Sequence, residues 1–353
     1  MIKIIDRYIF VHVISGTLLV LFVLVSLNAF LELLDQLEDV GRHNFGSLQA
    51  IAYVFYTLPG RVYESLPTAT LVGTLVGLGT LASSSQITAM RAAGMSVMDF
   101  IRSTFKSGVV LVLIAFTVGE WLSPWGWQVA EEMRATALSE KLTINRSGGL
   151  WLRDQERFVH AGSVIDDFRL QDVTIYTFDG RELTDVTSAS GAEKTVSGWE
   201  LVDVTEISIA ADKVLSEQKQ RLAWAGLVPE GMLDVLRIGP EEMSGRDLYQ
   251  YIQYMRSNDL DGSNYELAFL NRFIHPLTIL VMMFIAVPFL FAHQRGGGAG
   301  QQLFIGVVLG VGFFLLNLLC NQLGVVYGIP VLLSALLVPV TAVFITLHYV
   351  RRY

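Results

Sequence analysis

The sequence has 353 residues, of which 52% are hydrophobic and only 16% are charged, and its mean hydropathy is +0.48. Soluble domains carry about 25% charged residues, so this composition excludes an ordinary soluble protein and indicates a membrane protein. The net charge of −8 is unevenly spread: residues 126–264 hold 24 acidic and 14 basic side chains, and the remainder holds 9 and 11. Neither part has the strongly basic balance of a nucleic-acid-binding protein, so no nucleic acid partner is expected.

Six apolar runs are long enough to cross a bilayer, which takes about 20 residues. The first follows Lys3 and Arg7 as a signal peptide would. It exceeds the length of a signal-peptide core and lacks an Ala-x-Ala cleavage site, so we expect it to be retained as an anchor. The six predicted spans are residues 9–33, 50–81, 100–123, 266–292, 302–322 and 329–349.

Basic residues in the short loops predict the orientation of these spans. With a cytoplasmic N-terminus, Arg42 is the only basic side chain in a short outer loop. The basic side chains on the inner side are then Lys3, Arg7, Arg91, Arg102, Lys106, Arg295, Arg351 and Arg352. The positive-inside rule therefore predicts that both termini are cytoplasmic and that the 126–264 domain lies on the outer side.

The soluble domain has the pattern of a β-rich fold. Apolar and polar residues alternate on both sides of the polar turn 154–156 and again around Asp179-Gly180, a strong hairpin signal. Turn signals recur about every dozen residues, which favours a sandwich, a barrel or a jelly roll. Near its end, Ser244 is expected to cap a helix with an apolar stripe of Leu248, Ile252 and Met255.

The segment "LASSSQITAMRAAGMS", residues 81–96, is too polar for hydrocarbon and too regular for a loose loop. Ser84 or Ser85 can cap a helix that runs to about Ala93, and Gly94 suits the residue after its end, where φ is positive. The Ser96-to-Asp99 spacing is that of a capping box opening the next span. These signals predict a rigid cytoplasmic elbow between the second and third spans.

Two interpretations of this elbow remain open on its residues alone. Ile87 and Met90 share one face, and Thr88 and Arg91 lie on the other. Such an elbow can be the coupling helix that an ABC-transporter permease seats on a separate ATPase. Alternatively, it is an amphipathic helix that lies on lipid, although Arg91 is its single basic residue and lipid-surface helices usually carry more.

Searches for catalytic motifs fail. The chain lacks the G-x-x-x-x-G-K-[ST] of a P-loop, and "RGGGAGQQ" at 295–302 has neither the Lys nor the Ser/Thr. A membrane-anchored enzyme acting on envelope lipids is a second hypothesis, but its soluble domain would need clustered catalytic groups, and His160 is the only histidine there. A scaffold for periplasmic assembly is a third.

Polar residues within the spans need an explanation because charge in hydrocarbon is costly. They cluster toward the outer ends of the spans, and either they are solvated interfacial side chains or they line the polar mouth of a cavity for an amphiphile. The residues concerned are Glu32, Asp35, Arg61, Glu64, Glu120, Asn317, Asn321 and Gln322. Arg134 lies at the same height, where its guanidinium can either fork onto a phosphate or pair with Glu131 on its own helix.

Several stretches together resemble the LptF/LptG family of lipopolysaccharide-export permeases, and most closely the LptG branch. The matching stretches are "DRYIF" at 6–10, "LDQL" at 34–37, "GLGTLA" at 77–82, "GEWLSPWGWQVAEEMRATAL" at 119–138, "GLWLRD" at 149–154 and "VYGIP" at 326–330. They occur in the family's order over essentially the whole chain, with three spans on either side of the soluble domain.

The resemblance implies a non-catalytic, multi-pass subunit of the Gram-negative inner membrane. Members of the family pair with an LptF-like permease, dock two LptB-like ATPases that bind ATP and Mg²⁺, and pass lipopolysaccharide to LptC-like and LptA-like bridge proteins. No cofactor or metal is expected in the chain itself. The elbow then corresponds to the coupling helix, with Ser85, Gln86, Ile87, Met90, Arg91 and Gly94 as its coupling residues.

The same resemblance suggests substrate contacts at the outer mouth. Arg134 matches a basic position of the family that is suited to a lipid A phosphate, and Arg61 lies one residue from another. Apolar faces of the first and fifth spans, including Phe22, are expected to hold acyl chains beside Asn317. The sequence departs from the family in two places. Gln86 replaces a Glu suited to an Arg of the ATPase, and the outer end of the first span carries Glu32, Glu38 and Asp39 where the family pattern has lysine.

We therefore expect an α-helical membrane protein of six transmembrane helices, with a periplasmic all-β, jelly-roll-like domain inserted between helices 3 and 4. The expected domains are residues 1–125, which include the coupling helix at about 84–94, residues 126–264 and residues 265–353. Its expected function is extraction of lipopolysaccharide from the outer leaflet of the inner membrane, driven by a separate ATPase.

Overall fold

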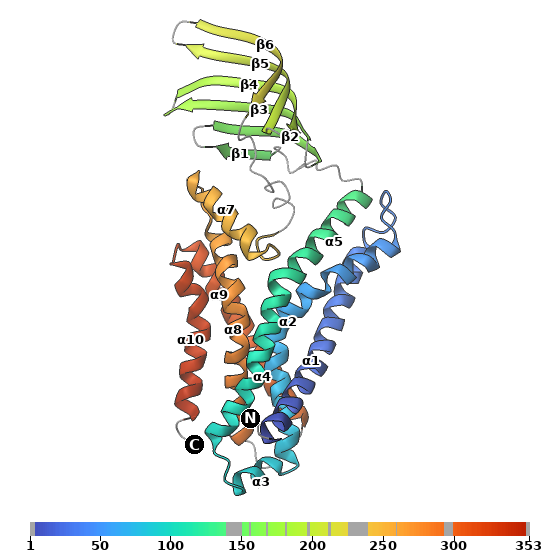
Figure 1. Cartoon of the computed structure of the whole chain (residues 1–353), viewed down its shortest axis with the longest axis vertical. Coiled ribbons are helices and arrows are strands. Elements are labelled where there is room, and N and C mark those ends of the chain that lie inside the picture. The colour runs from blue at the N-terminus through green and yellow to red at the C-terminus, as the bar shows by residue number, and fades with distance from the viewer. Residues whose placement is uncertain are drawn as a thin grey trace.

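The computed structural model describes residues 4–138, 150–154, 157–166, 169–180, 182–195, 198–210, 213–224, 239–258, 260–292 and 299–350. A bundle of long helices carries a β-sheet at one end, and a shorter helix, α7, lies between the two (Figure 1). The sheet is bent, and its first strands lie nearest the helices (Figure 1). The predicted combination of a helical membrane body and an all-β domain is confirmed.

Within the described residues, six helical segments are long and apolar enough to cross a membrane, which confirms the six predicted spans. The third of these is composite, because a π-helical turn joins two α-helices. In chain order the helices are α1 Ile4–Leu37, α2 Ser47–Ser83, α3 Gln86–Ala92, α4 Val97–Thr117, the π-helix η1 Val118–Leu122, α5 Ser123–Ala137, α7 Gly245–Ser257, α8 Ser263–Ala292, α9 Ala299–Val326 and α10 Val331–Val350.

The start of α1, the short helix α3 and the end of α10 lie together at one end of the bundle, and the sheet lies beyond the other end (Figure 1). Both marked chain ends, N and C, are at the α3 end of the bundle (Figure 1). This arrangement matches the loop placement that the basic residues predict. Of those residues, Lys3, Arg295, Arg351 and Arg352 lie outside the described ranges.

Helices α1 and α2 approach each other closely because glycines replace side chains at their contact. A Cβ atom on Gly16 would lie 2.3 Å from the carbonyl oxygen of Gly73, and one on Gly77 would lie 2.2 Å from the carbonyl oxygen of His12. Small residues four apart commonly bring membrane helices together in this way, since they let the backbones touch. The two helices therefore form one tightly packed unit. We call the contact between them, made by Gly16, Gly73 and Gly77, the glycine seam.

In the described part of the domain, six antiparallel strands form the sheet, and each strand pairs with its neighbours in the sequence. Hairpins are present at both predicted places: Asp154 pairs with Arg157, and Asp179 pairs with Glu182 beside Gly180 at φ +63°. The residues 155–156 of the first turn lie outside the described ranges. The strands are β1 Leu150–Asp154, β2 Arg157–Asp166, β3 Arg169–Asp179, β4 Glu182–Thr195, β5 Gly198–Ala210 and β6 Lys213–Trp224.

Helix α7 packs against residues of the sheet. Ser244 caps it as predicted, since its Oγ accepts a hydrogen bond from the Asp247 N–H at 3.2 Å. Leu248 is fully buried in a core with the sheet residues Val173 and Ile175. The sheet and α7 thus share one core on the opposite side of the bundle from α3.

Candidate functional site

The elbow at 84–96 is built by local capping signals. Gly94 has φ +93°; its N–H donates to the Arg91 carbonyl at 3.0 Å, and the Met95 N–H donates to the Met90 carbonyl at 3.1 Å. These two bonds form a Schellman motif, in which a residue with positive φ ends the helix. The Ser96 hydroxyl accepts from the Asp99 N–H at 3.1 Å, so the predicted capping box opens α4.

The predicted serine cap at the start of α3 is wrong. Ser85 does occupy the capping position, but its φ is +58° and its side chain makes no capping bond. The Ser84 hydroxyl bonds back to the Thr80 carbonyl at 2.7 Å, because it still belongs to the last turn of α2. A left-handed residue, rather than a side-chain cap, therefore turns the chain from α2 into α3.

The elbow residues divide into an inner and an outer set. Ile87 is 1% exposed and packs with α1, α2 and α4, and Gln86 is half-buried with its Oε1 accepting from the Tyr8 hydroxyl at 2.8 Å. Met90 is also half-buried. The outer surface is formed by Ser85, Thr88, Ala89, Arg91, Ala92, Ala93 and Gly94.

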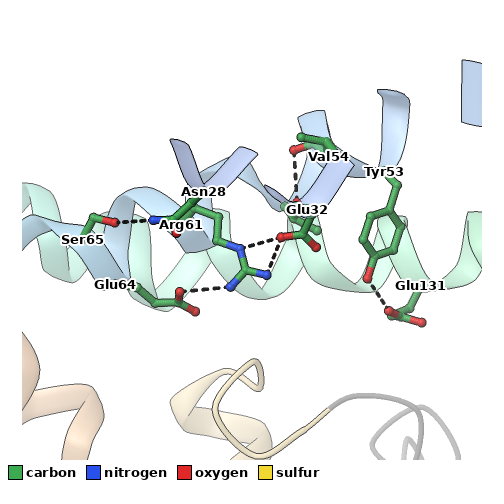
Figure 2. Close-up of polar contacts among 9 residues, drawn as sticks. Asn28, Glu32, Tyr53, Val54, Arg61, Glu64, Ser65 and Glu131 are labelled. Carbon is green, nitrogen blue, oxygen red and sulfur yellow. Dashed lines mark hydrogen bonds and ion pairs between the residues drawn. The ribbon is translucent and has the colours of Figure 1, made fainter. Parts of the chain in front are cut away.

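A second polar group lies where α1 and α2 run together toward the sheet. The Arg61 guanidinium donates to Glu32 through Nε at 2.7 Å and through a second nitrogen, and to Glu64 at 3.1 Å (Figure 2). Next to it the Asn28 amide donates to the Ser65 hydroxyl at 3.3 Å (Figure 2). The Glu32 side chain is 9% exposed, so it is a buried, paired carboxylate, and of the two alternatives left by the sequence the solvated interfacial one does not apply to it.

Arg134 of α5 forms an ion pair with Asp39, which lies outside its own helix, just beyond the end of α1. One of its terminal nitrogens donates to Asp39 at 2.7 Å, whereas Glu131, the partner we expected, accepts from the Tyr53 hydroxyl at 2.7 Å (Figure 2). Asp39 also accepts from Arg42 at 2.6 Å. The hydrogen bond from Arg134 and the nearby guanidinium charges lower the pKa of Asp39 below its usual value of 3.8.

A cavity of about 400 Å³ lies between α2, α5, α8 and α9, in the half of the bundle nearer the sheet. Its wall includes Arg61 and Glu64, and it also includes Asn317 and Asn321 of α9. The Oδ1 atoms of both asparagines are buried and have no hydrogen-bond partner, and the whole Asn321 residue is only 6% exposed. Buried polar atoms usually find a partner, so these acceptors suit a water or a hydrogen-bond donor of a bound molecule.

Arg272 is a buried cation that sequence reasoning missed. It is 5% exposed and donates to the backbone carbonyls of Gly119 at 2.6 Å, Glu241 at 2.8 Å and Met243. An arginine inside the run "LNRFIH" was the available signal, since charged residues in a span need a reason. Arg272 ties α8 to the π-helical turn of the third span and to the segment that leads into α7.

The remaining predicted residues lie apart from this cavity. Phe22 is 74% exposed on the outer face of α1, and Asp35 is exposed near the end of that helix. The structure therefore joins Arg61, Glu32 and Glu64 in one cluster and places Arg61 and Asn317 in one cavity. In the described part of the chain, no cluster of three His, Cys, Asp or Glu side chains could hold a metal ion.

The family model described as "Lipopolysaccharide export system permease LptF/LptG" matches residues 7–352 of this sequence. The chain belongs to the LptF/LptG family. It is 32% identical over 341 residues to the LptG permease protein of Haemophilus influenzae, which covers 96% of this chain and 95% of that protein. It is 31% identical over 353 residues to the LptG permease protein of Escherichia coli K12, which covers 99% and 98%.

Membership of the LptF/LptG family fixes the kind of activity. The chain is a multi-pass membrane permease of a lipopolysaccharide export system, and its role is transport rather than catalysis. The resemblance recognised in its motifs is confirmed. The predicted contacts with lipid and with an ATPase stay predictions. The residues predicted to contact an ATPase lie in the elbow, and two of those predicted to contact lipid, Arg61 and Glu32, lie in the polar cluster.

Proposed function

We propose that this permease is the membrane part of an ATP-driven extractor that lifts lipopolysaccharide out of the outer leaflet of the inner membrane. It acts with an LptF-like permease, and two LptB-like ATPases supply the ATP and Mg²⁺ chemistry. LptC-like and LptA-like proteins receive the lipid. Both termini and α3 face the cytoplasm, and the sheet faces the periplasm.

The observation that carries this proposal is the position of α3. A capped, seven-residue helix with a small-residue outer surface lies at the opposite end of the bundle from the sheet. The exposed basic residues Arg91 and Arg102 lie at that end, as the positive-inside rule requires of a cytoplasmic face. A surface of Thr88, Ala89 and Ala92 suits docking against a protein groove better than binding to anionic lipid.

The lipid side of the proposal rests on the exposed apolar face of α1 and α9. Phe22 on α1 and Phe314 and Leu316 on α9 are more than half exposed. Each CH₂ group moved into water costs about 0.8 kcal/mol, so a lipid with several acyl chains needs both a driving reaction and an apolar surface to follow. These helix faces supply that surface within the membrane.

We assign the lipid A phosphates to Arg134, with Arg61 second. The Arg134 Nε has no hydrogen-bond partner, so the guanidinium keeps an unused donor beside its ion pair with Asp39. Phosphate would bind in competition with Asp39. Arg61 is the weaker candidate for phosphate binding because two carboxylates, Glu32 and Glu64, already neutralise its charge.

Purification of the full complex tests the proposal. We expect a soluble ATPase to remain bound to the permease pair, and ATP to drive photo-crosslinkable lipopolysaccharide from proteoliposomes onto a bridge protein. Consistent absence of an ATPase would favour the scaffold hypothesis, and ATP hydrolysis by this chain alone would contradict the proposal.

The enzyme hypothesis has little support in the sheet. His160 is the only histidine of the 126–264 domain, and its ring packs against the Trp151 ring with the centroids 4.6 Å apart.

A further inference from the structure

The elbow helix α3 is fastened to α1 through contacts on its inner side. The Tyr8 hydroxyl donates to the Gln86 Oε1 at 2.8 Å, and the Tyr8 ring is held by His12, whose centroid lies 4.4 Å away. Ile87 lies in one buried cluster with Ile9 and other residues of α1. A hydrogen bond and a shared apolar cluster therefore join α3 to the start of α1.

The same end of α1 is fastened to α4, the helix on the other side of the elbow. Asp6 is 8% exposed; its Oδ2 accepts from the Lys106 Nζ at 2.6 Å, and its Oδ1 accepts from the Ser103 hydroxyl. Further along, the glycine seam holds α1 against α2. Consequently α1 is bound to both helices that flank α3 as well as to α3 itself.

We propose that Gln86 and Tyr8 are positioning residues that carry a displacement of α3 directly into α1. This inference rests on the proposed function, in which an ATPase displaces α3. Because the Gln86 acceptor is turned inward to Tyr8, the ATPase contacts fall to the outer residues Thr88 and Arg91. The helix that then moves is the one that presents Phe22 to the lipid and carries Glu32 in the polar cluster, so the displacement reaches both the lipid-facing surface of α1 and the buried polar cluster.

The test uses near-isosteric variants in the complete complex, assayed with photo-crosslinkable lipopolysaccharide in proteoliposomes. Tyr8→Phe keeps the ring, and Gln86→Met keeps the side-chain length, so each removes the hydrogen bond alone. We expect each variant to lower the amount of lipid extracted per ATP about two- to tenfold, because this is the change in an equilibrium constant that the loss of one hydrogen bond typically causes. The double variant should lose no more than either single variant, since both remove the same contact.

Two further variants separate coupling from folding. Gln86→Glu keeps an acceptor for Tyr8 and should retain the wild-type ratio of lipid to ATP. Gly312→Ala, on α9, adds a Cβ that meets nothing within 4 Å and should leave hydrogen exchange of residues 86–92 unchanged, whereas Tyr8→Phe should accelerate it. ATPase retention and ATP hydrolysis should be unaffected in Tyr8→Phe and Gln86→Met.

The inference is overturned if Tyr8→Phe extracts lipid normally, if the two single losses multiply in the double variant, or if Gln86→Met sheds the ATPase. In those cases Gln86 either contacts the ATPase or has no role in coupling. A wild-type complex that retains no ATPase, or extracts no lipid with ATP, would instead overturn the proposed function and this inference with it.

Discussion

Removing the charge of Arg61 should destabilise the permease far more than removing that of either carboxylate partner. In Arg61→Met, Glu32 remains as a buried carboxylate without its cation, and its side chain is only 9% exposed. Breaking one side of a buried ion pair costs about 3–5 kcal/mol. Loss of the guanidinium 5.2 Å from the centre of the Trp127 ring adds about 0.5–1 kcal/mol.

The partner variants should be milder because Arg61 keeps an acceptor in each. Glu32→Gln replaces the carboxylate acceptor of Arg61 by a neutral amide oxygen, at a cost of about 1 kcal/mol. Glu64 is 52% exposed, so its ion pair is screened and Glu64→Gln should cost about 0–1 kcal/mol. In Arg61→Met combined with Glu32→Leu no buried charge is left, and the double variant should be more stable than Arg61→Met alone.

Reversible unfolding in mixed detergent micelles, followed by tryptophan fluorescence, measures these free energies. The ordering of the variants is the test, since a cluster that was solvated at the membrane surface would give small and additive effects. An Arg61→Met variant as stable as the wild type, or a double variant less stable than Arg61→Met, would refute the reasoning.

Three other changes have defined outcomes. Gly73→Ala places a Cβ 2.4 Å from the Thr17 backbone and should separate α1 from α2, seen as lower unfolding stability, whereas Gly312→Ala meets nothing within 4 Å and should behave as the wild type. Gly94→Ala also meets no atom but must adopt φ +93°, so we expect a strain of about 1–2 kcal/mol confined to the elbow, measured as faster hydrogen exchange there; unchanged exchange would contradict it. The folded-state pKa of Asp39 is lowered, so its contribution to stability is present above about pH 4 and is lost as the pH falls through the folded-state pKa. Asp39→Asn should therefore abolish this part of the loss of stability in acid. The same loss of stability in acid in wild type and variant would argue against this role of Asp39. In proteoliposomes Asp39→Asn should also raise lipid crosslinking at Arg134, and a decrease would remove the competition that we infer.

The local features of this permease could be predicted from its sequence, since each depends on residues close together in the chain. The six spans follow from runs of apolar residues, and the elbow follows from Gly94 and from the Ser96–Asp99 spacing. The hairpin at Asp179-Gly180 follows from turn chemistry. The motifs of the third span carried the family resemblance, and the family comparison confirmed it.

The partners of the charged residues could not be predicted, because they depend on which helices pack together. Glu32 and Arg61 are 29 residues apart, Asp39 and Arg134 are 95 apart, and Arg272 reaches a carbonyl 153 residues away. The candidates visible in the sequence were neighbours on the same helix, such as Glu131 for Arg134. The π-helical turn at 118–122, which offers the Gly119 carbonyl to Arg272, has no local signal that we can identify.

The most direct test of the account is the exposure of α3 in the assembled exporter. In a Cys320→Ala background, a cysteine at Thr88 should react with a membrane-impermeant maleimide only from the cytoplasmic side, and the ATPase should protect it. A cysteine at Arg42 should react only from the periplasmic side in the same membranes. Labelling of position 88 from the periplasm, or equal labelling with and without the ATPase, would contradict the claim that this elbow receives the ATP-driven stroke.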